Sequence, residues 1–265
     1  MKVSASRIIL YSDCSLKYKF RYIDKIDKFS PSIHLAYGTA VHAGLEYLGK
    51  SSTLREEEML QVFHDTWHKE IKKHEIRTSK YTDRLYEMGI NTLLKYYGMV
   101  VGESGLKYET ICTEKRFEIE IPELEDEEKF IAVGVIDVVL KDGKNLLVVD
   151  YKTAKAAFEP FKMKTSVQLP LYSYAFRKML ADGEYPALGK KTKEDYIAYY
   201  VFVKDYENLD GEIQIRKKKV ANYDRLFYIL KTFKKGTENE IFIPNYESIN
   251  CKWCEYKKEC LEFKK

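Results

Sequence analysis

Three residues near the middle of the chain have the types and spacing needed for metal-dependent chemistry. Asp137 stands in one apolar run, and Asp150 and Lys152 close the next. An Asp-Gly pair between the runs favours a hairpin, which would set the two carboxylates side by side. Burying like charges together is unfavourable, and Mg²⁺ or Mn²⁺, which prefer oxygen ligands, would relieve the repulsion. Lys152, on the same strand face as Asp150, could then orient a water or counter charge on a phosphorane.

Tyr151 lies between these two residues and is expected to point to the opposite face of the strand, although its backbone carbonyl remains available as a metal ligand. Taken alone, an Asp-x-Lys pair at a strand end is more often a surface ion pair. The hypothesis of metal-assisted phosphodiester hydrolysis therefore depends on which other residues accompany Asp150 and Lys152.

The surrounding periodicity predicts the elements that must position these residues. Helical spacing is expected over Ser6–Ile23, from Gly38 onward, over residues 54–101, and over Ser166–Leu180 and Asn222–Lys235. Alternation predicts strands at Thr110–Ile121, Phe130–Leu140, Asn145–Thr153, Asp195–Lys204 and Glu212–Lys217. We expect a mixed α/β or α+β fold, with a central mixed sheet flanked by helices, a helical N-terminal subdomain and a cysteine-rich tail.

Composition limits the class of protein more than its function. The 265 residues are 45% hydrophobic, enough for a sizeable core, and no apolar stretch is long enough to cross a bilayer. No secretory signal, P-loop or Rossmann fingerprint is recognisable, so we expect a cytoplasmic protein without a membrane partner. The net charge of +4 is modest. The basic run Arg216, Lys217, Lys218 and Lys219 is compatible with DNA binding and equally with a solvated face.

The order of several motifs resembles one known family. Gly134-Val-Ile-Asp137, followed twelve residues later by Asp150-Tyr-Lys152, is similar to the core motif of the PD-(D/E)xK nuclease superfamily in its RecB-like form. Gly38-Thr-Ala-Val-His42 resembles the motif whose histidine adds a metal ligand. Gln168-Leu-Pro-Leu-Tyr172 resembles the Gln-x-x-x-Tyr motif that follows the active strand, and Ser4–Tyr18 resembles the family's N-terminal helix.

This resemblance implies a role for each matching residue. His42, Asp137, Asp150 and the Tyr151 carbonyl would bind Mg²⁺ or Mn²⁺. The catalytic set would comprise Lys152 together with Asp137, Asp150, Gln168 and Tyr172. The glutamine and tyrosine, four residues apart on one helix face, would position the lysine, the water or the DNA backbone. Glu114 sits where many members carry a strand glutamate, and we rank it below the motif residues.

Four of the five cysteines form a second constellation. Cys251, Cys254 and Cys260 cluster in the tail, and Cys14 could supply a fourth ligand if the termini meet; Cys112 is expected to be buried in a strand. Clustered thiols in a cytosolic protein suggest metal before disulfide. The arrangement resembles the iron–sulfur staple of RecB-like nucleases such as the AddB nuclease domain and the CRISPR-adaptation nucleases. It implies a structural [4Fe–4S] cluster, with Zn²⁺ or free thiols as alternatives.

These observations predict one nuclease domain over residues 1–265, with a helical subdomain at 44–105, a nuclease core at 107–240, and a staple formed by 245–265 with Cys14. The expected function is a metal-dependent deoxyribonuclease, an exonuclease on single-stranded DNA or DNA ends in recombination, repair or CRISPR adaptation. The expected partners are DNA and other proteins of recombination or CRISPR adaptation. The alternatives are a non-catalytic DNA-end-binding subunit and a zinc-stapled RNA-processing protein. Cleavage polarity and oligomeric state are left open.

Overall fold

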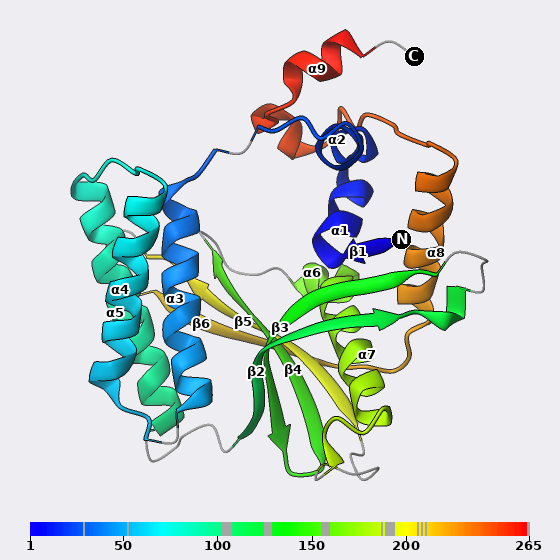
Figure 1. Cartoon of the computed structure of the whole chain (residues 1–265). Coiled ribbons are helices and arrows are strands. Elements are labelled where there is room, and N and C mark those ends of the chain that lie inside the picture. Colours follow the sequence, from blue (N-terminus) through cyan, green and yellow to red (C-terminus); the bar gives the residue numbers. More distant parts are fainter. Residues whose placement is uncertain are drawn as a thin grey trace. The chain divides into compact units, whose positions relative to one another are not determined.

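The computed structural model describes residues 1–28, 30–51, 53–101, 108–124, 129–154, 160–186, 188, 194–205, 207, 209 and 211–263 (Figure 1). Contacts divide the chain into two compact units. The terminal unit comprises Met1–Ser30, Phe117–Gly134 and Ala221–Lys265, and the central unit comprises Pro31–Arg116 and Val135–Val220. The single nuclease domain expected over residues 1–265 stays a prediction.

A mixed sheet organises the central unit. Strands β3 (Ile131–Asp142) and β4 (Asn145–Ala154) form an antiparallel hairpin, β5 (Asp195–Val203) lies parallel to β4, and β6 (Glu212–Lys219) lies antiparallel to β5. Strand β2 (Glu109–Glu120) pairs with β3. The hairpin turns at Gly143, whose φ of 59° suits glycine. The predicted mixed sheet flanked by helices is therefore confirmed.

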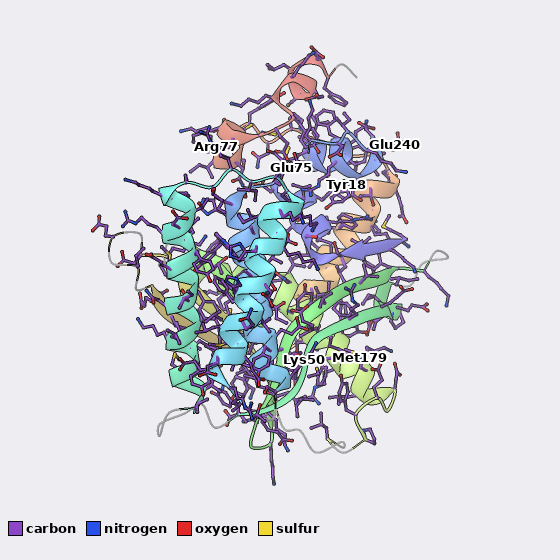
Figure 2. All side chains as sticks on the ribbon, turned by 60° about the vertical axis from the view of Figure 1, so that its left-hand side comes forward. Tyr18, Lys50, Glu75, Arg77, Met179 and Glu240 are labelled. Carbon is purple, nitrogen blue, oxygen red and sulfur yellow. The ribbon has the colours of Figure 1, made fainter. Side chains whose placement is uncertain are left out.

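Helices cover both faces of this sheet (Figure 1). On one face, α3 (Ile33–Lys50), α4 (Glu56–Lys73) and α5 (Lys80–Val101) bury an apolar core against alternate side chains of the strands. The core includes Phe63 and Trp67 from α4 and Val149 and Tyr200 from the sheet. On the other face, α7 (Gln168–Ala181), preceded by α6 (Pro160–Thr165), contacts β4 and β5. Figure 2 labels Lys50 at the end of α3 and Met179 on α7.

The terminal unit joins the two ends of the chain. Strand β1 (Lys2–Ser4) pairs in parallel with Ile131–Val133 of β3. The remaining elements of this unit are α1 (Ala5–Asp13), α2 (Ser15–Tyr18), the π-helix η1 (Lys19–Ile23), the 3₁₀ turns η2 (Pro122–Leu124) and η4 (Ile249–Trp253), and the helices α8 (Asp224–Glu238) and α9 (Lys257–Glu262). Tyr18, labelled in Figure 2, packs edge-on against Tyr11 and Phe233. This aromatic cluster ties α1 and α2 to α8.

Three predicted helical segments differ from those in the structure. The helix expected over Ser6–Ile23 breaks at Cys14, whose extended backbone (φ −155°, ψ 103°) separates α1 from α2. The break is stabilised because the Lys17 N–H donates to Cys14 Sγ at 3.5 Å and so begins a new helix. The helical pattern predicted over residues 54–101 corresponds to two helices, α4 and α5, and α7 begins at Gln168 rather than Ser166. None of the helices in the described part of the chain combines the length and apolar character that crossing a bilayer requires.

Candidate active site

The hairpin brings Asp137 and Asp150 to one place, as its sequence predicts. Its ladder runs from the turn to the pair Val138 and Val149, and one further step of the same register sets Asp137 opposite Asp150. At that point the Tyr151 N–H donates to Asp137 Oδ2 at 2.7 Å. At the end of the strand ladder, the Asp137 side chain therefore accepts the hydrogen bond of the Tyr151 backbone N–H.

Asp150 is the most buried member of the site, with 2% of its side chain exposed. Its Oδ2 lies 2.6 Å from Lys152 Nζ, and its Oδ1 accepts a 2.7 Å hydrogen bond from Gln168 Nε2. Burial raises the pKa of Asp150 and the Asp137 charge raises it further, while the Lys152 ammonium opposes both. Asp150 and Lys152 lie on a strand that has a neighbouring strand on each side. They are therefore not the surface ion pair that an isolated Asp-x-Lys motif suggests.

Gln168 connects the acidic and basic groups. It is the first residue of α7, and its amide accepts from Lys152 Nζ at 3.2 Å while donating to Asp150 and, at 3.0 Å, to the Tyr172 hydroxyl. These contacts fix which side of the amide faces each partner. Tyr172 lies one helical turn further along and is buried. The structure therefore brings Gln168 to Asp150, and Tyr172 joins the same network through Gln168.

His42 approaches the carboxylates from α3. Its Nδ1 lies 3.8 Å from Asp137 Oδ2, and its ring stands edge-on to Tyr151 with centroids 6.0 Å apart. Burial lowers the pKa of His42, and the Asp150 charge only partly opposes this. A neutral imidazole is the form that binds a metal. Tyr151 itself points into the opposite core, where its hydroxyl meets that of Tyr96 at 3.2 Å.

Glu114 joins this group, although the sequence ranks it below the motif residues. One ligand atom each from His42, Glu114 and Asp137 lies within 4.8 Å of the others. Burial, aided by the Asp137 charge, raises the pKa of Glu114 to about 7. The only sequence signal for it is the resemblance, because Glu118 and Glu120 lie on the same predicted strand.

The donors of this group fit a hard divalent cation. With metal–oxygen distances of about 2.1 Å, octahedral ligands lie roughly 3.0–4.2 Å apart, so small side-chain adjustments would close the group around one ion. A pocket of about 550 Å³, lined by His34, Gly38, His42, Glu114 and Asp137 among others, opens beside it. One imidazole and two carboxylates suit Mn²⁺ or Mg²⁺.

The predicted basic run lies on β6, away from this group. Arg216 pairs with Tyr199 of β5, which in turn pairs with Asp150 of β4. Residues 217–219 follow along β6 in the direction of the hairpin turn. Lys217 Nζ is 3.3 Å from Asp142 Oδ2, and Lys219 forms an ion pair with Glu194. Arg216 also donates to Gln214 Oε1 at 3.2 Å, so three of the four cations are engaged within the protein. Their role in DNA binding stays a prediction.

The four predicted cysteines meet in the terminal unit. Cys14, Cys251, Cys254 and Cys260 line a pocket of about 260 Å³ together with apolar side chains such as Phe20, and all are free thiols. Burial raises the pKa of Cys260, followed by the charge of Cys14. The described residues contain no trio of cysteine sulfurs within 4.8 Å of one another. Four thiols around a partly apolar pocket fit a metal or iron–sulfur group chemically.

Comparison with known proteins identifies the family. The model of the PD-(D/E)XK nuclease superfamily matches residues 2–261. The chain belongs to this superfamily. Its nucleases use divalent metals, which agrees with the His42, Glu114 and Asp137 group.

Distant relatives of this superfamily member are ATP-dependent helicase/nuclease subunits A. The one from Clostridium acetobutylicum is 25% identical over 71% of this chain, and the one from Thermoanaerobacter sp. is 28% identical over 62%. The matches cover only 14% and 13% of those two proteins. The crystal structure of SSO0001 aligns with 97% of this chain and 98% of its own, at 13% identity and a TM-score of 0.39.

Proposed function

We propose that the chain is a divalent-metal-dependent deoxyribonuclease that hydrolyses phosphodiester bonds. The observation that carries this proposal is the coincidence of two groups in one corner of the central unit. One is the metal-type donor set His42, Glu114 and Asp137, and the other is the network of Asp150, Lys152 and Gln168. Polarisation of a phosphate and activation of water are the chemistry that a divalent cation supplies when bound there.

Lys152 is proposed as the catalytic cation. Its side chain is 39% exposed while Asp150 is almost fully buried, so the ammonium lies at the border between protein and solvent. Asp150 and Gln168 hold Nζ from within the protein, which leaves its outer side able to contact a phosphate. A fixed positive charge at that place stabilises negative charge that develops in the transition state.

Gln168 and Tyr172 are proposed as positioning residues. The amide holds Asp150 and Lys152 through separate atoms, and the Tyr172 hydroxyl accepts from the amide. Their contribution is to limit the motion of the ammonium, because small misplacements of a catalytic group are costly. The Tyr151 carbonyl, at the edge of the same strand, is proposed as a backbone ligand.

The finer assignment is an exonuclease of the RecB-like iron–sulfur type that acts on single-stranded DNA or DNA ends in the cytoplasm. The names of the distant relatives, ATP-dependent helicase/nuclease subunits, support a nuclease that works beside a helicase. A place in recombination, repair or CRISPR adaptation is part of the proposal. The cysteine pocket supports a [4Fe–4S] cluster. Four cysteine thiolates suit Zn²⁺ as well, so iron and zinc analysis decides between the two.

Cleavage of labelled DNA tests the proposal. Single-stranded and duplex substrates labelled at the 5′ or 3′ end are incubated with Mn²⁺, Mg²⁺ or EDTA, beside Asp150→Ala and Lys152→Ala. Lys144→Ala, an exposed lysine at the hairpin turn, is the matched control. We expect metal-dependent release of short products from one end, lost in the two site variants and kept in the control. Binding without cleavage by the wild type would favour the non-catalytic DNA-end-binding alternative.

A further inference from the structure

Two exposed histidines stand one helical turn apart on α4. The ring centroids of His64 and His68 lie 4.4 Å apart, and the two rings are tilted by 59°. Residues four apart lie on the same face of a helix, and two histidines at this spacing can hold one cation between them. Neither histidine belongs to the nuclease motifs or lines the pocket beside the carboxylate site. The pair is therefore a separate group of metal-type donors.

Tyr86 of α5 holds the first of these rings. Its hydroxyl lies 2.7 Å from His64 Nδ1, and α4 and α5 lie side by side (Figure 1). This contact engages Nδ1 and leaves Nε2 of His64 available to a cation. Histidines that bind metals usually engage their second ring nitrogen in such an outer contact, which fixes the orientation of the ring. His64 is thus oriented before any cation binds.

Buried aromatic rings fix Tyr86 in turn. Its ring centroid lies 5.4 Å from that of Phe63 and 5.7 Å from that of Trp67, and both of these side chains are buried in the core of the central unit. The ring of His68 lies 6.0 Å from the same tyrosine. Tyr86 therefore contacts both histidine rings while it is anchored from inside the protein.

The donor atoms select the class of cation. Imidazole nitrogens suit Zn²⁺, Ni²⁺ and Cu²⁺, whereas Mg²⁺ prefers oxygen. Two nitrogens that bind one such ion at about 2.1 Å lie about 3–3.4 Å apart, which rings with centroids 4.4 Å apart reach by small side-chain rotations. Within the described residues, neither histidine belongs to a group of three or more close His, Cys, Asp or Glu donors. Water would fill the other positions of the ion, so we expect reversible binding.

We propose that His64 and His68 form a second metal site, for a late first-row divalent cation such as Zn²⁺ or Ni²⁺, and that Tyr86 orients His64 for it. The site goes beyond the proposed nuclease function and takes no part in the cleavage reaction. Only the folded helix sets the two histidines side by side, so an ion bound by both stabilises the native state. The gain should fall on α4 and, through Tyr86, on its contact with α5.

Quenching of Trp67 fluorescence by paramagnetic Ni²⁺ tests the site where it lies. The chain has two tryptophans, and Trp253→Phe, at an exposed position, leaves Trp67 as the only one. Excess Mg²⁺ limits binding of Ni²⁺ at the carboxylate site. We expect saturable quenching in this background. His64→Gln or His68→Gln should raise the Kd for Ni²⁺ about 10-fold or more, since loss of an outer-shell partner alone costs that much.

Two further variants separate ligand from partner and from bystander. Tyr86→Phe keeps both imidazoles and removes the hydroxyl, so it should raise the Kd by a smaller factor. His74→Gln is the matched control, because His74 caps the end of α4 and pairs with Glu70 at 3.3 Å. It should change the Kd by no more than about 2-fold, as expected of a site that shares no contacts with the pair. An unchanged Kd in Tyr86→Phe overturns the orienting role of the hydroxyl.

Melting curves give a second readout. Circular dichroism without metal shows that the His64→Gln, His68→Gln double variant is folded, and Ni²⁺ should raise its Tm less than that of the wild type. Quenching that does not saturate, or equal Kd values and equal Tm shifts in wild type and double variant, overturns the site. DNA cleavage is measured separately in Mg²⁺, so either proposal can fail without the other.

Discussion

The carboxylate site of the central unit and the cysteine pocket of the terminal unit differ in what holds their side chains. Asp150, Lys152 and Gln168 stand on a ten-residue strand and a fourteen-residue helix, and each contacts the other two. The cysteines stand on the break between α1 and α2, on the five-residue turn η4, just after it, and on the six-residue helix α9. Elements this short are not stable by themselves.

The difference indicates two kinds of dependence on a bound group. The carboxylate site is organised by the protein, so loss of its cation should abolish chemistry and leave the fold intact. The cysteine pocket is organised by short segments, so loss of what its thiols bind should loosen the terminal unit. Each prediction below tests one side of this contrast.

The largest effect is expected at Asp150 and Lys152. Asp150→Asn and Lys152→Met should each lower the cleavage rate by about 10³-fold, the scale seen when an electrostatic stabiliser of a transition state is removed. Their effects on stability should differ. Lys152→Met leaves a buried carboxylate without its ammonium and should lower the Tm, whereas Asp150→Asn should leave it nearly unchanged. Initial rates and melting curves of both variants check this, and equal Tm losses would contradict the asymmetry.

Removing a thiol from the pocket should chiefly affect stability. Cys14→Ser is expected to remove visible iron–sulfur absorbance and to lower the Tm by roughly 10 °C, because a crosslink closing a loop of this length contributes about 4–5 kcal/mol. Cys112→Ser is the matched control, since Cys112 lies in β2 of the central unit outside the pocket. Absorbance, iron and zinc content and melting curves decide it. A colourless protein with stoichiometric zinc would show that the thiols hold zinc and not an iron–sulfur cluster.

Gln168 should show an intermediate effect on activity. Gln168→Leu removes both contacts to the ion pair and should lower the cleavage rate about 10- to 100-fold, the scale of a lost positioning residue. Gln168→Glu keeps an acceptor for Lys152 but sets a carboxylate against Asp150, so its deficit should grow as pH rises. Rate–pH profiles of the two variants separate positioning from simple packing. Parallel profiles would contradict this role for the amide.

Much of the central sheet and of the carboxylate site was predictable from sequence. Asp137, Asp150 and Lys152 follow from strand alternation and an Asp-Gly turn, which are local rules, and the predicted strands end within two residues of those observed. Gln168 and Tyr172 follow from helical spacing, although only the resemblance singles them out.

The remainder depends on tertiary contacts. The strand conformation of Glu114 at positive φ has no local signal, because glutamate rarely adopts it. The break at Cys14 depends on a thiol that caps the next helix, and cysteine has no strong helix-breaking propensity. The partners of Lys217 and Lys219 come from Asp142 and Glu194, which only the folded sheet brings near.

Titration of Glu114 should appear in the stability of the metal-free protein. Its folded pKa of about 7 exceeds the ordinary value of 4.5, so the native state holds this proton more tightly than the unfolded state. The resulting stabilisation is complete below about pH 4.5 and is lost as pH rises through 7, a loss of about 1–2 kcal/mol after solvent screening. The Tm of the wild type in EDTA should therefore fall relative to Glu114→Gln between pH 5 and 8. Added Mn²⁺ should reverse the trend, because the cation binds the deprotonated carboxylate. A constant Tm difference across this range would contradict the raised pKa.

The basic run should give the smallest effect. Lys217 and Lys219 already pair with Asp142 and Glu194, and Lys217 also stacks over Tyr196 at 4.5 Å. A cation that contributes a full phosphate contact would lower the salt slope of DNA binding by about 0.7–0.9 when removed. We expect Lys217→Ala and Lys219→Ala to change this slope by much less, and Lys218→Ala, which is exposed beside Ile197 on β5, to change it most. Fluorescence anisotropy with a labelled single strand at several salt concentrations measures the slopes. Equal, full-sized losses at all three lysines would mean that DNA displaces the internal ion pairs, and the basic run would then belong to the functional surface.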